Sequence, residues 1–118
     1  MVKAVRWVGS SNADLKRFPD PVRRRMGFAI HQAQAGLRHR DAKPLRGFGP
    51  GVLEVVARHD GDTFRAVYTI RFETALYVLH AFQKKSGRGV RTPKRELDLI
   101  ARRLTAAKRH HEETPSGT

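Results

Sequence analysis

The stretch that decides the fold is VLEVVARHDGDTFRAVYTIRF, residues Val52 to Phe72. Two runs rich in β-branched and aromatic residues, Val52 to Arg58 and Thr63 to Phe72, flank the pair Asp60-Gly61. Asp-Gly between alternating runs is typical of a tight hairpin turn, because both residues tolerate the positive φ that the turn requires. The sequence therefore predicts two antiparallel strands at the centre of the fold.

This turn also predicts which side chains share a face. With Asp60 and Gly61 as the two loop residues, Val56 lies opposite Arg65, and successive side chains alternate between the faces. The apolar face, which we expect to be the core, carries Leu53, Val55, Ala57, Phe64, Ala66, Tyr68 and Ile70. The other face carries Glu54, Arg58, Arg65 and Arg71.

Arginines around one carboxylate on an open sheet face suggest a phosphate-binding floor. The alternative is an ordinary solvated face with cross-strand ion pairs. A third strand is predicted from Ala75 to about Gln83, and Lys84 and Lys85 at its end are positioned to close over the floor. His80 falls on the parity of Val78 and Phe82 in that strand, where a packed, hydrogen-bonded histidine is the more common outcome.

Outward from the hairpin, the pattern indicates further elements on both sides. We expect a strand over Val2 to Val8, a short helix from Ser11 to about Arg17, and a helix over 21–37 that begins at Asp20-Pro21. Residues 38–51 are rich in Gly and Pro, and we expect a loop there. A last helix, capped by Thr92 and entered through Pro93, has the apolar stripe Leu97, Ile100, Ala101, Leu104 and Ala107.

The predicted order is β-α-α-β-β-β-α, an α+β fold in which helices pack on one side of a small antiparallel sheet of about four strands. We expect one domain over 1–108 and a disordered tail over 109–118. His110 and His111 in that tail are adjacent residues and do not indicate a metal site. No cofactor or metal is expected.

Composition points to an anionic partner. The chain of 118 residues has 24 Lys and Arg against 11 Asp and Glu, a net charge of +13, which attracts nucleic acid. It has no cysteine, which excludes disulfides and a thiol nucleophile. No apolar run is long enough for a membrane helix and the N-terminus does not read as a signal peptide, so a cytoplasmic location is expected.

Several runs together resemble a known family. They are Lys43-Pro44-Leu45-Arg46-Gly47, Val52-Leu53-Glu54, Phe64-Arg65-Ala66-Val67-Tyr68, the run from Tyr77 to Ser86 that ends in FQKKS, Thr92-Pro93, and Ile100 to Leu104. This pattern is similar to the phage-derived, HigB-like branch of the RelE/ParE toxin superfamily over roughly residues 15–107. The resemblance implies a small antiparallel sheet with two N-terminal helices and one C-terminal helix.

The resemblance also implies a function: the toxin of a type II toxin–antitoxin pair that cuts mRNA, typically on the ribosome. Its partner would be an antitoxin, often a helix-turn-helix DNA-binding protein. The implied catalytic residues are Arg65 for phosphate stabilisation, Lys84 and Lys85 for phosphate binding or proton transfer, and Glu54 and His80 as general-base candidates. The residues expected to bind RNA are Arg46, Arg58, Arg71, Arg88, Arg91 and Lys94.

Two other functions stay open at this point. A ParE-like toxin would have the same fold, DNA gyrase as its target and no nuclease chemistry. A small basic nucleic-acid-binding protein of phage origin would neither cleave RNA nor inhibit gyrase. A degenerate toxin would keep the fold and would have lost its toxic activity. Keeping Arg65 together with Lys84 and Lys85 favours the nuclease.

Overall fold

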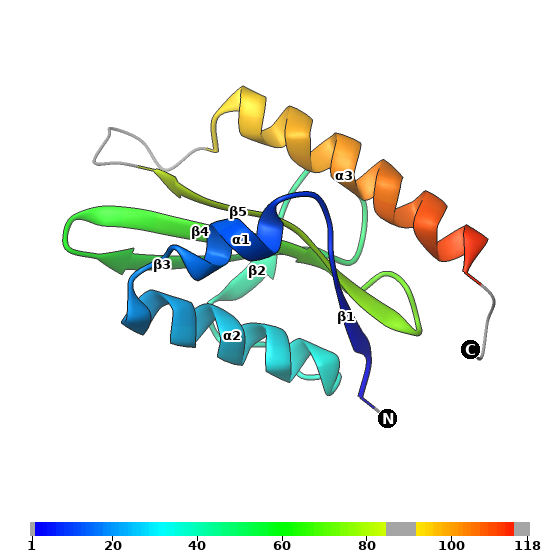
Figure 1. The fold of residues 1–118 in the computed structure, drawn as a ribbon, viewed down its shortest axis with the longest axis horizontal. Helices are drawn as coiled ribbons and strands as arrows, with labels where there is room; N and C mark the ends of the chain where they lie inside the picture. Colours follow the sequence, from blue (N-terminus) through cyan, green and yellow to red (C-terminus); the bar gives the residue numbers. More distant parts are fainter. Residues whose placement is uncertain (1, 85–91, 115–118) are drawn as a thin grey trace.

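The computed structural model describes residues 2–84 and 92–114, and within them it has an α+β fold of one sheet and three helices (Figure 1). The elements are β1 (Ala4–Trp7), α1 (Ser11–Lys16), α2 (Asp20–Gln34), β2 (Ala42–Pro44), β3 (Val52–His59), β4 (Asp62–Thr69), β5 (Ala75–Lys84) and α3 (Lys94–Glu113). The strand order is β1-β5-β4-β3-β2. The predicted fold class is confirmed.

The central hairpin forms as the sequence predicts. Val56 pairs with Arg65, and the turn residues Asp60 and Gly61 have φ values of 50° and 83°. Two features of the sheet differ from the prediction. β1 pairs with β5 in parallel, so the sheet is mixed, and β2 is an added edge strand in the region expected to be a loop. β2 has only three residues, too few to show an alternating pattern.

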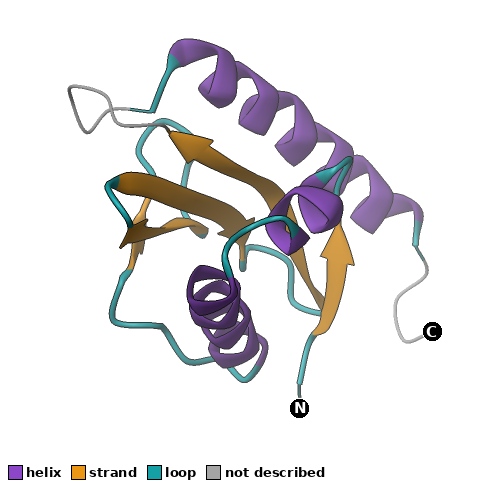
Figure 2. Ribbon diagram, turned by 60° about the vertical axis from the view of Figure 1, so that its left-hand side comes forward, coloured by secondary structure: helices purple, strands orange, loops and turns teal. Residues whose placement is uncertain are grey.

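The helices cover both faces of the sheet, which corrects the expectation that they pack on one side (Figure 2). α1 and α2 pack on the face of Leu53, Phe64 and Tyr68. Ile100 and Ala107 of α3 pack on the opposite face. The sequence of β5 agrees with helices on both faces of the sheet. A strand that is buried on both faces has a nearly continuous apolar run, and β5 contains the run ALYVLHAF. Ile70, expected in the core, lies beyond the end of β4 and is 38% exposed.

A β-bulge changes the parity of β5. Val67 pairs with His80 while its neighbour Tyr68 pairs with Val78, so Leu79 has no partner of its own in this register. One extra residue in a strand moves each following side chain of that strand to the opposite face of the sheet. His80 therefore faces α3, whereas Val78 lies in the core under α1 and α2. The sequence had placed these two side chains on the same face.

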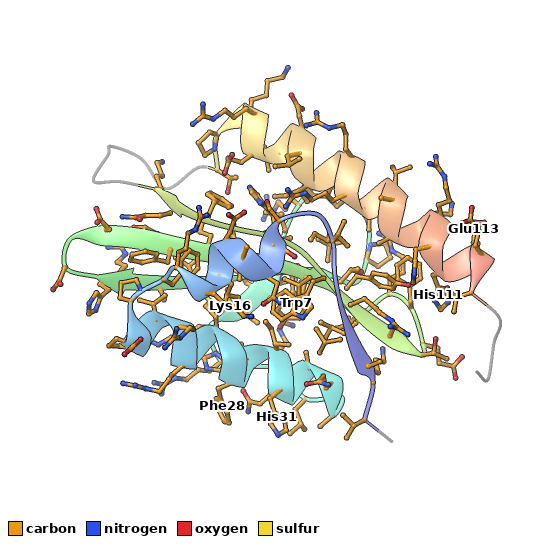
Figure 3. The ribbon with its side chains drawn as sticks, in the orientation of Figure 1. Trp7, Lys16, Phe28, His31, His111 and Glu113 are labelled. Atoms are coloured by element: carbon orange, nitrogen blue, oxygen red, sulfur yellow. The ribbon has the colours of Figure 1, made fainter. Side chains whose placement is uncertain are left out.

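The last helix is longer than expected. α3 continues to Glu113, so the prediction of a disordered tail is wrong for 109–113; residues 115–118 lie outside the described part. The hydroxyl of Tyr77 lies 2.7 Å from Nδ1 of His110. The ring of His111, which Figure 3 labels near the end of α3, stacks on Phe72 at 4.7 Å. These contacts with β5 and with the segment before it supply the stability that the polar local sequence lacks. Among the described residues, no helix has the length and hydrophobicity needed to cross a membrane.

Candidate phosphate-binding site

The bulge and the hairpin together place three rows of side chains on the α3 face of β3, β4 and β5. From the middle of the sheet toward the hairpin turn, the rows are Glu54–Val67–His80, Val56–Arg65–Phe82 and Arg58–Thr63–Lys84. The structure therefore brings together Glu54, Arg58, Arg65, His80 and Lys84 from the sequence-predicted set. We call the last row, Arg58, Thr63 and Lys84, the hairpin row.

Glu54 and Arg65 form a buried ion pair beneath the start of α3. Oε1 of Glu54 lies 3.0 Å from Nη1 of Arg65, and the residues are 4% and 5% exposed. The hydroxyl of Thr92 donates to Oε2 of Glu54 at 3.2 Å. The face expected to be open is thus covered at this point. Thr92 does not cap α3 as predicted, because Pro93 is the N-cap residue and no side chain caps the helix.

His80 is held at both ring nitrogens. Nε2 lies 3.0 Å from Oε2 of Glu96, and Nδ1 lies 3.2 Å from Nη1 of Arg103. Because a guanidinium only donates, Nδ1 must accept, and the ring proton sits on Nε2 and is donated to Glu96. Burial lowers the pKa of His80 below its ordinary value of 6.5, and the hydrogen bond to Glu96 partly opposes this shift. The neutral ring also stacks on Phe82 at 4.8 Å.

Arg103 extends this network to a third element. Its guanidinium also donates to the carbonyl oxygen of Leu79 at 3.0 Å and to the hydroxyl of Ser10 at 3.0 Å, and that hydroxyl donates to Asp14. Burial lowers the pKa of Arg103. Sequence reasoning missed Glu96 and Arg103. The two residues are seven positions apart, with Ile100 of the apolar stripe between them, so both lie on the sheet-facing side of α3. This spacing is the feature of the sequence that could have predicted their contact with the sheet.

The cations that remain accessible lie at the edge of the site. In the hairpin row Arg58 is exposed and Lys84 is half-buried. Lys94 is exposed at the start of α3, with its Nζ 3.8 Å from Oδ2 of Asp98. Lys85, Arg88 and Arg91 lie outside the described residues. This edge can hold a phosphate group by charge-assisted hydrogen bonds.

Arg46 and Arg71 lie at the far end of the sheet. Arg71 follows the end of β4, so strand alternation no longer sets its direction, and it donates to the carbonyl oxygens of Pro50 and Phe48. Arg46 follows β2, whose last residue pairs with the start of β3. Six residues of strand, about 20 Å, separate this end from Arg58. The expectation that Arg71 shares one cluster with Glu54, Arg58 and Arg65 is therefore wrong.

The described residues contain no group of three His, Cys, Asp or Glu side chains that could hold a metal ion. The chemistry that the site offers is electrostatic: Arg58 and Lys84 lie at the edge of the sheet beside a buried ion pair.

Comparison with known proteins gives one family and one fold. The family model described as phage derived protein Gp49-like (DUF891) matches residues 13–105. No curated protein matches the chain. The free-state structure of a double arginine-to-alanine mutant of the E. coli toxin RelE is similar, with a TM-score of 0.57 at 15% identity, over 90% of this chain and 98% of that one. At this identity the likeness shows the fold alone.

Proposed function

The chain belongs to the phage-derived Gp49-like family, and from that premise we propose that it is the toxin of a type II toxin–antitoxin pair and cleaves mRNA. Family membership and the RelE fold support a toxin of the toxin–antitoxin type. Within the superfamily we assign it to the HigB-like branch, on the run that ends in FQKKS. The proposed partners are a cognate antitoxin and the translating ribosome.

The hairpin row is the observation that carries the nuclease proposal. Cleavage beside a 2′-hydroxyl requires loss of the hydroxyl proton, stabilisation of charge on the phosphate, and protonation of the leaving oxygen. Arg58 and Lys84 lie on either side of Thr63 at an accessible edge, where both can contact one phosphate. Arg65 lies one row deeper in an ion pair with Glu54, so we propose that it stabilises charge on the phosphate through the row above it and not by direct contact.

Glu54 and His80 are less suited to act as general bases than the sequence suggested. Both carboxylate oxygens of Glu54 and both ring nitrogens of His80 are engaged in contacts within the protein. These contacts favour positioning over proton transfer for both residues. RelE-type enzymes often carry lysines on the strand that matches β3, where this chain has Glu54 and Val56. We propose Lys84 as the residue that assists proton transfer, on the ground of its position in the hairpin row opposite Thr63.

Expression in growing cells, followed by mapping of mRNA 5′ ends, tests this function. We expect growth arrest and new 5′ ends inside translated messages for the wild type. Lys84→Ala should reduce cleavage by about 10²-fold, the usual cost of removing one group that stabilises the transition state. Arg58→Ala should weaken cleavage less. The matched control is Arg17→Ala, an exposed arginine at the end of α1, which should keep full toxicity.

Arg65 needs a different design, because it stabilises the fold. Arg65→Ala would leave Glu54 buried without its cation, at a cost of about 3–5 kcal/mol. The double variant Glu54→Gln/Arg65→Gln removes both charges and should be more stable than Arg65→Ala alone. If the folded double variant, checked by circular dichroism, still cleaved at the wild-type rate, the role of Arg65 would be wrong.

Two outcomes would replace the proposal. Intact messages together with inhibited gyrase supercoiling would indicate a ParE-like toxin. Intact messages, normal supercoiling and retained nucleic-acid binding would indicate a non-catalytic protein or a degenerate toxin. Purified chain incubated with mRNA, with and without ribosomes, measures the dependence on the ribosome.

A further inference from the structure

A second basic surface lies on the side of the molecule opposite α3. It surrounds a hollow of about 570 Å³ between the outer side of α2 and the loop before β2. We call it the α2 surface, and its residues are Arg24, Arg25, Phe28, Gln32, Arg38, His39 and Arg40. Figure 3 shows Phe28 and His31 projecting from α2 away from the sheet. The sheet and α2 therefore separate this surface from the hairpin row.

The arginines of the α2 surface lack acidic partners. In residues 2–84 and 92–114, no carboxylate lies within ion-pair distance of Arg24, Arg25, Arg38 or Arg40. The neighbouring Arg23 shows the contrast, since its guanidinium lies 2.6 Å from Oδ1 of Asp20. Like charges that gather without counter-charges repel one another, and an anionic ligand relieves that repulsion.

An aromatic ring stands among these arginines. Phe28 is 54% exposed, and it contacts the ring of His39 edge-on with a centroid distance of 5.8 Å. His39 is itself buried and is held by the backbone N–H of Asp41, which donates to its Nδ1 at 3.0 Å. An exposed aromatic ring on a fixed support, with arginines around it, is the arrangement on which single-stranded nucleic acid stacks its bases.

Gln32 adds an independent observation. Its Oε1 atom is buried and has no hydrogen-bond partner among the described residues, although the side chain lines the hollow. A buried polar atom without a partner is costly, so rotation of this amide toward a ligand group in the hollow is favoured. Because an amide both donates and accepts, it suits the edge of a nucleobase.

We propose that the α2 surface binds a single-stranded segment of RNA. The arginines hold successive phosphates, one unstacked base lies on Phe28, and Gln32 bonds to its edge. An acidic protein helix is the less favoured occupant, because it would bury a stripe of apolar side chains and the hollow has one exposed apolar side chain among four arginines. The proposal does not depend on cleavage.

The test measures the binding of a uniform 2′-O-methyl RNA oligonucleotide, which has no 2′-hydroxyl to attack the phosphate. Fluorescence anisotropy over a series of salt concentrations gives Kd and its salt dependence for the full chain. Arg25→Gln/Arg40→Gln should reduce the slope of log K against log salt by about 1.4, since each phosphate contact on a single strand contributes about 0.7. Phe28→Leu should weaken binding about 5- to 150-fold, and Phe28→Tyr should keep it.

The matched control is Arg102→Gln/Arg109→Gln, which removes two exposed arginines from α3. If this control lowered the affinity and the slope as much as the α2 pair, and Phe28→Leu changed nothing, RNA would be held by overall charge and the proposal would be wrong. Loss of antitoxin binding with unchanged RNA binding in the α2 variants would identify a protein-binding surface instead. Since the oligonucleotide cannot be cleaved, failure here is separate from failure of the nuclease.

Discussion

His80 shows how one side chain can connect the elements around a site. Its imidazole lies on β5, accepts from Arg103 and donates to Glu96 of α3, while Arg103 also reaches Ser10 before α1. The charged and titratable groups that face it are Glu96 and Arg103, with Asp14 further away. A histidine in this setting stabilises the fold as long as it stays neutral.

The stability of the chain should therefore fall in mild acid. The folded-state pKa of His80 lies below 6.5, so between these values the unfolded chain binds more protons and stability rises with pH. The contribution of neutral His80 to the free energy of unfolding is complete above about pH 6.5. It is lost as pH falls below that value, by at most about 1.4 kcal/mol per pH unit for one proton. Urea unfolding at a series of pH values measures this slope. His80→Gln should flatten it, and the exposed control His31→Gln should not; equal slopes in all three proteins would contradict the prediction.

At the scale of elements, the loop into β3 and the helix α2 use glycine for different reasons. Gly51 has a φ of 83°, and a Cβ there would lie 3.2 Å from the backbone N and Cα of Arg71. Gly27 lies inside α2, and a Cβ there would contact nothing within 4 Å. The first glycine is required by the close approach of Arg71, whereas the second is not required by any contact.

Alanine at these two positions should have opposite effects on the free energy of unfolding. Gly27→Ala should raise it by about 0.5–1 kcal/mol, because alanine has the higher helix propensity. Gly51→Ala should lower it by about 1–3 kcal/mol, because alanine is strained at positive φ. Chemical denaturation of the two variants checks the signs. A neutral Gly51→Ala would mean that the loop relaxes away from Arg71.

For the whole molecule, the defining feature is a sheet covered on both faces. One layer, α1 and α2, buries the larger core, and α3 covers the other face together with Leu45 and Phe48 of the segment between α2 and β3. The last turn of α3 is held by His110 on Tyr77 and His111 on Phe72. These two contacts close the end of the smaller core.

Removing them should destabilise the chain and loosen the end of α3. His110→Ala/His111→Ala should cost about 1.5–4.5 kcal/mol, the sum of two aromatic contacts and one hydrogen bond. Hydrogen exchange at 109–113 should become faster. Glu112→Ala/Glu113→Ala changes two exposed side chains of the same turn and should cause no such loss. Unchanged exchange in the histidine variant would show that the helix end does not depend on the sheet.

The amino-acid sequence by itself determined the hairpin, its register, and the gathering of Glu54, Arg58 and Arg65 on one face. These follow from a two-residue turn and the alternation of side chains, which depend only on neighbours in the chain. The tertiary structure decided the bulge that turns His80 toward α3, the cover that buries Glu54 and Arg65, and the partners Glu96, Arg103 and Thr92. It also separated Arg71 from the site. Such features depend on contacts between residues far apart in the sequence, and no local pattern specifies which face of a sheet a distant helix will cover.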